Sequence, residues 1–132
     1  MNSPRFSVII TSHNQRGYIT DAVNSALAQG CADKEIIVVD DASSDGSPAT
    51  LKEYGDKIRL AAFQTNQGAN TARNLGAAMT KGEYFVFLDG DDVLLPWALD
   101  VYNRIVDARK PKIILSSMNW FVVLQMFLRI TA

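Results

Sequence analysis

Short apolar runs alternate with segments of helical period along most of this chain. The apolar runs predict strands at residues 6–11, 35–39, 58–63, 84–88 and 113–116. Between these runs, apolar side chains recur with the 3.6-residue period of a helix. Strands that alternate with helices are typical of an α/β fold, in which helices flank a mostly parallel sheet. The pattern therefore predicts an α/β fold.

The expected helices begin and end near recognisable signals. They occupy residues 18–29, a short segment after the polar turn at 42–48, residues 68–79 and residues 96–108. Gly30 is a stop signal for the first helix. The side chain of Asn66 is placed to cap the third helix. Pro96 suits the first position of the last helix, because its missing N–H costs nothing there.

The end of the chain departs from this pattern. NWFVVLQMFLRITA is strongly apolar but is interrupted by Gln125 and Arg129, so it is too short and too polar to span a bilayer. We divide the chain into a domain at residues 1–117 and an apolar tail at 118–132. The tail is expected to form a final core strand or helix. The alternative is an exposed apolar segment, which would favour association.

Polar side chains gather where three of the expected strands end. They belong to Thr11, His13, Asn14, Asp40, Asp41, Asp89 and Asp91. Parallel α/β sheets bind ligands outside the carboxyl ends of their strands. Three segments that lie far apart in the sequence are therefore expected to converge on one crevice.

The run YFVFLDGDDVLLP places three carboxylates, those of Asp89, Asp91 and Asp92, at the end of one apolar strand. Ionised carboxylates this close repel one another, and such clusters are usually neutralised by a cation. Oxygen ligands suit Mg²⁺ or Mn²⁺, and Mg²⁺ is typically held by one or two carboxylates together with substrate phosphates. The run therefore favours a metal-assisted phosphate or diphosphate site.

Composition narrows the class of protein. A chain of 132 residues with 48% hydrophobic and 20% charged residues suits one globular domain. Thirteen basic against fourteen acidic residues give a formal charge of −1, so nucleic acid is not an expected partner. The single cysteine, Cys31, has no internal disulfide partner and is expected to be a small buried hydrophobe. The N-terminus lacks the pattern of a signal peptide. A cytoplasmic location is therefore expected, with peripheral membrane association left open.

Several blocks of the sequence resemble the family 2 glycosyltransferases, which have the GT-A fold and transfer a sugar from a nucleotide diphosphate sugar. FSVIITSHNQRGYITDAVNSALAQ looks like the family's opening strand and helix, and EIIVVDDASSDGS looks like its second strand and acidic turn. NQGANTARNLGAAMTKGEYFVFLDGDD looks like its central helix, fourth strand and Asp-x-Asp motif. The likeness runs from about residue 5 to residue 117. It implies a GT-A (Rossmann-like), mostly parallel sheet.

The resemblance implies roles at the nucleotide end of the crevice. Thr11, His13 and Asn14 would line the base and ribose, with His13 standing where the family often has a tyrosine. The acidic pair Asp40 and Asp41 would accept hydrogen bonds from the base or the ribose. Asp and Ser also favour turns and caps, so Asp40, and still more Asp45 and Ser43, have a structural alternative.

It also implies roles at the diphosphate end. Arg73 would counter the diphosphate charge. Asp89 and Asp91 would touch the ribose and a divalent Mn²⁺ or Mg²⁺ ion, which would bridge the diphosphate and stabilise the leaving nucleotide. Asp92 is a weaker candidate, placed to support these groups. The expected donor is a UDP-sugar, inversion is the expected outcome, and the acceptor, a saccharide or a lipid-linked molecule, is left open.

Members of this family carry a second, acceptor-binding half that supplies the general base. No acidic residue follows Asp107 in this sequence, so the tail cannot provide that base. The chain is therefore expected to be the donor-binding part of a transferase, incomplete at the C-terminal acceptor half. As a fragment or truncated product, it would have weak or absent transfer activity on its own.

Three other classes remain as alternatives. A catalytically inactive nucleotide-binding or interaction module would share the fold and differ in turnover. A receiver-like phosphoacceptor domain also uses acidic residues around Mg²⁺, but it carries its acidic pair after the first strand, whereas Asp40 and Asp41 follow the second. A dinucleotide-binding oxidoreductase is disfavoured because the turn TSHNQRG lacks the glycines that let backbone approach a pyrophosphate.

Overall fold

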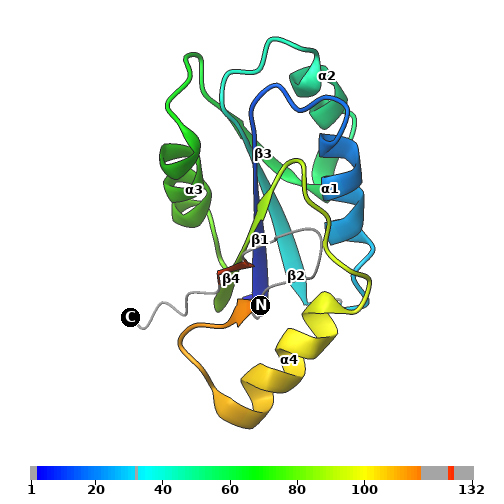
Figure 1. The fold of residues 1–132 in the computed structure, drawn as a ribbon, viewed down its shortest axis with the longest axis vertical. Helices are drawn as coiled ribbons and strands as arrows, with labels where there is room; N and C mark the ends of the chain where they lie inside the picture. The colour runs from blue at the N-terminus through cyan, green and yellow to red at the C-terminus, as the bar shows by residue number, and fades with distance from the viewer. Residues whose placement is uncertain (1–2, 32, 117–124, 127–132) are drawn as a thin grey trace.

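A four-stranded sheet with the order β3-β2-β1-β4 runs through the centre of the molecule (Figure 1). The computed structural model describes residues 3–31, 33–116 and 125–126. β1 (Phe6–Ser12) pairs in parallel with β2 (Lys34–Asp40) and with β4 (Tyr84–Asp89), and β2 pairs in parallel with β3 (Arg59–Ala62). The predicted α/β fold with a parallel sheet is therefore confirmed.

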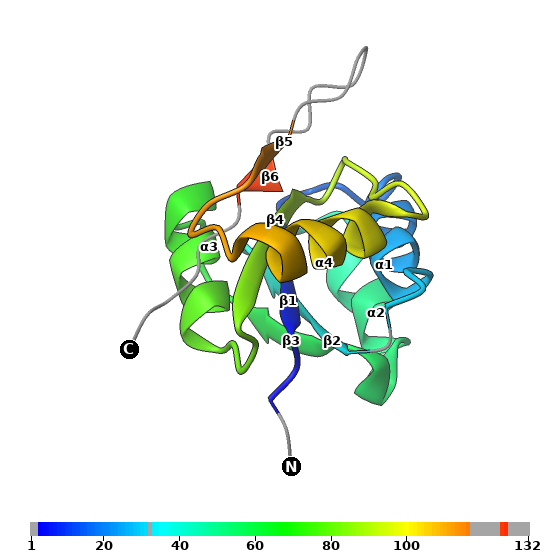
Figure 2. The ribbon, with the colours of Figure 1, turned by 90° about the horizontal axis from the view of Figure 1, so that it is seen from below.

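Helices cover both faces of this sheet, as Figures 1 and 2 show. α3 (Ala69–Ala78) packs on one face against Ile37 and Val39 of β2. The other face carries α1 (Ile19–Leu27), α2 (Ser47–Lys52) and α4 (Ala98–Arg109), with a short 3₁₀ helix at Gly55–Lys57. Because β1 and β2 are buried on both faces, their sequences read as continuous apolar runs.

Strand register brings the polar strand ends together. Ser12 pairs with Asp40 across β1 and β2, and Thr11 pairs with Asp89 across β1 and β4. Gly90 continues the line, since its N–H donates to the carbonyl oxygen of Thr11 over 2.8 Å. The carboxyl ends of β1, β2 and β4 thus lie at one edge of the sheet.

Gly76 sets how closely α3 approaches the sheet. It is buried in the last turn of the helix, three residues before the C-cap Met79. A Cβ atom at this position would overlap the Cγ2 methyl of Ile9, which is fully buried in β1. The missing side chain therefore lets α3 lie directly on β1, and this fixes the height of Arg73 above the strand ends.

The predicted strands agree with the observed ones to within a residue or so in the parallel sheet, but two helix boundaries were wrong. α1 ends at Leu27, before the predicted stop at Gly30. α4 begins at Ala98, so Pro96 lies in the preceding turn and not in the helix. The reason for the second difference is Gln29. Its side chain donates to the Leu95 carbonyl and accepts from the Leu99 N–H, and so fixes where α4 starts.

The cap predicted for Asn66 was also wrong in detail. The N-cap of α3 is Gly68, which has a φ of 88° and no side chain to cap the helix. The Asn66 carboxamide oxygen instead accepts a hydrogen bond over 3.0 Å from the N–H of Gly68, the residue just before the first residue of α3. Asn66 therefore shapes the loop that leads into α3.

The strand predicted at 113–116 is shorter than expected. β5 (Leu115–Ser116) has two residues and pairs antiparallel with β6 (Gln125–Met126), apart from the parallel sheet. The pairing depends on Gln125 and Met126 of the tail, for which a final core strand or helix was expected without assigned bounds. Most of the tail, and the prediction made for it, lies outside the described residues.

Candidate functional site

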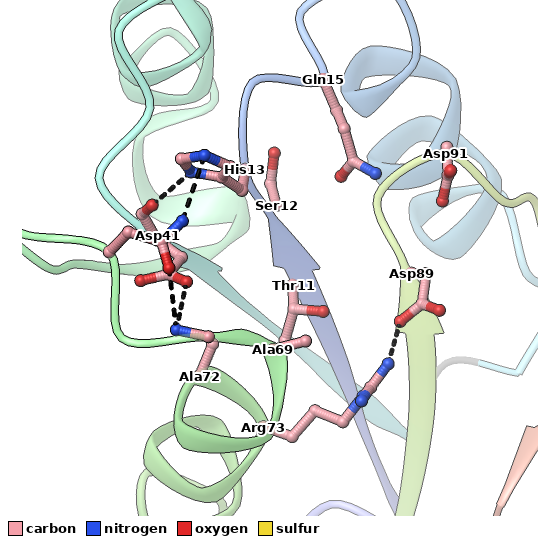
Figure 3. A pocket seen from close by; sticks show the side chains of 12 residues that line it. Thr11, Ser12, His13, Gln15, Asp41, Ala69, Ala72, Arg73, Asp89 and Asp91 are labelled. Atoms are coloured by element: carbon pink, nitrogen blue, oxygen red, sulfur yellow. Dashed lines mark hydrogen bonds and ion pairs between the residues drawn. The ribbon is translucent and has the colours of Figure 1, made fainter.

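A cavity of about 320 Å³ opens at the carboxyl ends of β1 and β4, beside the start of α3 (Figure 3). Its wall is formed by Thr11, Ser12, His13, Gln15, Asp41, Asn66, Gly68, Ala69, Ala72, Arg73, Asp89 and Asp91. The residues come from the ends of β1 and β4, from the loops that follow β1, β2, β3 and β4, and from the first turns of α3. The predicted convergence of three separated segments on one crevice is therefore confirmed.

Six of the eight residues predicted for the site line the cavity, and Asn14 and Asp40 do not. Asp40 is 1% exposed, and its carboxylate accepts from the Ser43 N–H over 2.9 Å. Asn14 is exposed, accepts from the Ser44 N–H over 2.8 Å and donates its own N–H to Ser43 Oγ. Asp40 and Asn14 therefore hold loop backbone in place. This is the structural role that Asp and Asn side chains often have in turns, as opposed to a role in ligand binding.

One side of the cavity, which we call the loop-side wall, consists of His13, Asp41 and Asn66. His13 Nδ1 lies 2.6 Å from the Asp41 carbonyl oxygen, so this nitrogen carries the proton and donates. Nε2 is then an acceptor, and the amide nitrogens of Asn66 and Asn14 lie 3.1 Å and 3.3 Å from it. With both ring nitrogens occupied, His13 offers the cavity the face of its ring.

Asp41 is the anchor of the same wall. The residue is 3% exposed, and its two carboxylate oxygens accept from the N–H groups of Gln67 and Gly68 over 2.7 Å and 2.8 Å. The strand end of β2 thus holds the loop that leads into α3. A carboxylate has about four acceptor sites, so these two bonds leave lone pairs for a ligand.

Asp45 ties the loop after β1 to the loop after β2. Its carboxylate accepts from the N–H and hydroxyl of Ser47 over 3.0 Å and 2.6 Å, and from the Arg16 N–H over 2.8 Å. The Ser47 side chain, followed by these backbone donors, lowers the pKa of Asp45 from 3.8 to about 2. Asp45 is thus a second ionised carboxylate that connects the two loops from which His13 and Asp41 come.

The opposite side, the carboxylate-side wall, consists of Gln15, Arg73, Asp89 and Asp91. Arg73 reaches over from α3, and its Nη2 lies 2.6 Å from Asp89 Oδ1. The side chains of this pair are 33% and 48% exposed, so the ion pair is open to the cavity and to solvent. Asp91 is exposed and has no hydrogen bond or ion pair with the part of the chain that the structure describes.

Negative charge accumulates on this wall. Burial, together with the charges of Asp91 and Asp89, raises the pKa of Asp92. Arg73 offsets part of the charge, and a cation or a cationic partner would offset more. Among the described residues, no group of three His, Cys, Asp or Glu side chains is placed to hold a metal ion by itself. Two carboxylates are nevertheless what Mg²⁺ usually takes from a protein when phosphates complete its coordination.

Sequence reasoning missed half of the residues that line the cavity. These are Ser12, Gln15, Asn66, Gly68, Ala69 and Ala72. Most are neutral and small, so neither charge nor motif spacing marks them. The position of Ser12 and Gln15 within TSHNQ, between residues already predicted for the site, was the one available signal.

Residues 7–121 match the family model described as glycosyl transferase family 2. The chain belongs to this family. An uncharacterized glycosyltransferase of Nostoc sp. is 43% identical over 107 residues, which is 78% of this chain and 32% of the relative. The succinoglycan biosynthesis protein ExoO of Rhizobium meliloti is 32% identical over 117 residues, which is 88% of this chain and 34% of the relative. The chain thus spans about a third of the length of these family 2 relatives.

Solved structures give the same fold. TarS of S. aureus, in complex with UDP-GlcNAc, matches with a TM-score of 0.80 and 28% identity, over 90% of this chain and 36% of that chain. The mannosyltransferase PcManGT of Pyrobaculum calidifontis, in complex with GDP-Man and Mn²⁺, matches with a TM-score of 0.75 over 98% of this chain and 45% of that one. At 19% identity, PcManGT supports the fold alone. The chain has the GT-A fold expected of a family 2 glycosyltransferase.

The helices of this family 2 chain are short, and α4 has 12 residues. Within residues 3–31, 33–116 and 125–126, no helix is long and apolar enough to cross a membrane.

Proposed function

We propose that the cavity binds a nucleotide diphosphate sugar, most simply a UDP-sugar, for transfer by the protein to which this chain belongs. The observation that carries the proposal is the carboxylate-side wall. Asp89 and Asp91 of the Asp-x-Asp run stand at the carboxyl end of β4, in one cavity with Thr11, His13, Asp41 and Arg73. Family membership and the UDP-GlcNAc complex of TarS support the choice of ligand.

The two walls suggest how a nucleotide lies in the cavity. The loop-side wall takes the base, because the face of the His13 ring can stack on it and Asp41 has acceptor sites left for its N–H groups. The carboxylate-side wall takes the ribose and the diphosphate. Asp89 accepts from ribose hydroxyls, and Arg73 contributes a positive charge beside the phosphates.

The residues of the carboxylate-side wall fit a divalent cation such as Mn²⁺ or Mg²⁺. Asp91 has an exposed carboxylate free to coordinate, and Asp89 stands at the same strand end. Such an ion would neutralise the diphosphate charge that develops as the nucleotide leaves. The raised pKa of Asp92 agrees with this fit, because the charges of Asp91 and Asp89 contribute to it after burial, which is its largest cause.

We assign donor binding to this chain and leave proton transfer to other parts of the protein. Inverting transfer, the expected outcome, needs a general base on the acceptor side. The acidic residues that line the cavity are Asp41, Asp89 and Asp91. Asp41 holds two backbone N–H groups, Asp89 holds Arg73, and Asp91 is proposed for the metal, so none of them is free to act as that base.

The test is a calorimetric titration of the chain with UDP, with and without Mn²⁺, for the wild type, Asp91→Ala and the control Asp56→Ala. Asp56 is an exposed carboxylate in the 3₁₀ helix before β3, at the opposite end of the sheet. We expect Mn²⁺ to strengthen UDP binding, Asp91→Ala to abolish that gain, and Asp56→Ala to preserve it. A folded wild-type chain that does not bind UDP would contradict the proposal.

Binding without turnover is the second candidate, and the engagement of two of the three cavity carboxylates, Asp41 and Asp89, favours it for the chain alone. The same preparations, incubated with UDP-GlcNAc, Mn²⁺ and candidate saccharide acceptors, separate the two. Release of UDP that depends on the added acceptor, with the sugar recovered on that acceptor and at a rate above that of Asp91→Ala, would mean that the chain carries out the transfer by itself.

A further inference from the structure

The carboxamide of Gln15 is a polar group of the cavity that the geometry leaves without a partner. Gln15 Oε1 is buried and has no hydrogen-bond donor within the described residues. Its Nε2 atom makes no hydrogen bond there either, and it is not among the buried atoms that lack a partner. The oxygen is therefore buried, and the N–H₂ group of this cavity-lining residue is accessible to a ligand. Figure 3 shows this side chain pointing into the pocket from the loop after β1.

Packing holds the carboxamide in this position. The Gln15 carbonyl accepts from the N–H groups of Tyr18 and Ile19 over 2.9 Å and 2.8 Å, which fixes the residue at the start of α1. Gln15 Oε1 lies against Gly90, the residue between Asp89 and Asp91, and a Cβ atom on Gly90 would overlap it. Gly90 itself is tied to the Thr11 carbonyl. The carboxamide thus stands beside the Asp-x-Asp turn and not beside His13 and Asp41.

A second buried polar atom without a partner lies in the same loop. Ser12 is 2% exposed, lines the cavity, and its Oγ has no hydrogen-bond partner within the described residues. Buried polar groups are nearly always satisfied, and those left over at a cavity mark where a ligand or water supplies the bond. Ser12 Oγ and the accessible N–H₂ group of Gln15, both on cavity-lining residues, thus give one stretch of four residues two polar groups without a partner among the described residues.

Charge decides which part of a ligand this wall would meet. Arg73 is the cationic side chain among the residues that line the cavity, and Asp89 already pairs with it. Gln15 adds an uncharged N–H donor beside the carboxylates. A phosphate oxygen can accept a hydrogen bond from this donor. Because an amide does not compete with a divalent cation, the two groups can bind the same diphosphate together.

We propose that Gln15 is a positioning residue for the diphosphate, donating through Nε2 to a phosphate oxygen of the nucleotide. This inference rests on the proposed function. It adds a contact on the phosphate side that the Asp-x-Asp turn and Arg73 do not supply.

The test compares UDP with uridine, which lacks phosphate, in NMR titrations at constant Mn²⁺. The variants are Gln15→Leu, which removes the donor at nearly the same size, and Gln15→Glu, which replaces it with a negative charge. Gln64→Leu is the matched control, because Gln64 is exposed and does not line the cavity. A melting curve for each variant reports folding.

We expect Gln15→Leu to weaken UDP binding about tenfold or more, as loss of one hydrogen bond to a charged group does, with uridine binding unchanged. Gln15→Glu should weaken UDP further through repulsion. The melting temperature of Gln15→Leu should not fall, because the lost Oε1 atom had no partner. Equal weakening of UDP and uridine, or unchanged UDP binding, would overturn the role of Gln15. A wild type that binds neither ligand would instead overturn the proposed function, and this inference with it.

Discussion

The two walls of the cavity differ in how completely their polar groups are satisfied. On the loop-side wall, both nitrogens of the His13 ring and both carboxylate oxygens of Asp41 have partners within the protein. On the carboxylate-side wall, the Gln15 side chain has no partner among the described residues, and the ionised form of Asp92, which follows this wall in the chain, is disfavoured. One wall is thus built before any ligand binds, whereas the other is left with excess negative charge and free polar groups. The difference indicates that ligand and cation complete the second wall.

The largest expected effect comes from breaking the loop-side wall at Asp41. Asp41→Ala leaves the N–H groups of Gln67 and Gly68 without their acceptor, and hydrogen bonds to charged groups contribute about 1.5–3 kcal/mol each. Since the two bonds share one carboxylate, we expect a loss of about 3 kcal/mol in the free energy of unfolding, measured by urea denaturation. Asp41→Asn keeps one acceptor oxygen and should lose less. Equal stability of wild type and Asp41→Ala would show that water replaces the carboxylate.

A smaller effect is expected from moving Arg73 away from the rest of the carboxylate-side wall. Gly76→Ala places a methyl group against Ile9 and forces α3 away from β1, and overpacking of this kind costs about 1–3 kcal/mol. The shift would carry Arg73 away from Asp89, so UDP binding should weaken more than uridine binding. Gly17→Ala is the control, because a Cβ atom there meets nothing within 4 Å. A Gly76→Ala variant with wild-type stability would mean that α3 is not held in direct contact with β1.

The smallest effects should have opposite signs on the two sides. The pKa of Asp45 is lower in the folded protein than its ordinary 3.8, so its ionised form stabilises the fold above that pH. That contribution is lost as the pH falls from about 4 toward 2. Asp45→Asn should therefore be less stable than wild type at pH 7, and the two should converge by pH 2 in urea denaturation.

Asp92 is the matching variant for this comparison. Its pKa is raised, so its charge opposes folding at neutral pH, and Asp92→Asn should gain a few tenths of a kcal/mol there. Mn²⁺ should reduce that gain by balancing the charge of the wild type. If Asp45→Asn and Asp92→Asn change stability in the same direction at pH 7, the proposed contrast between the walls is wrong.

The sequence predicted the parts of this molecule that depend on local pattern. Continuous apolar runs marked β1, β2 and β4 because parallel strands are buried on both faces. The carboxylates of Asp89 and Asp91 stood out because like charges at a strand end repel one another, and such clusters are usually neutralised by a cation. The boundary of domain and tail at residue 117 stays a prediction.

What the sequence did not predict depends on contacts between distant segments. Gln29 fixes the start of α4 from a position 70 residues away, so Pro96 was misleading as a helix signal. Asp41 was expected to accept hydrogen bonds from the base or the ribose, and the structure adds two that it accepts from the backbone N–H groups of Gln67 and Gly68. Gln15 is uncharged and belongs to no recognised motif. Its position against Gly90 follows only from the contact between the loop after β1 and the loop after β4.

The central place of β1 has a consequence for how the protein folds. β1 pairs with β2 and with β4, and the register that joins Phe6 to Tyr84 closes a long stretch of chain. The entropy of closing a loop of this length is lost before the pairing contributes, so folding is expected to be slow compared with that of helical proteins. During synthesis, one edge of β1 stays open until β4 has left the ribosome. Until then, the nascent chain presents a strand edge on which another chain can pair.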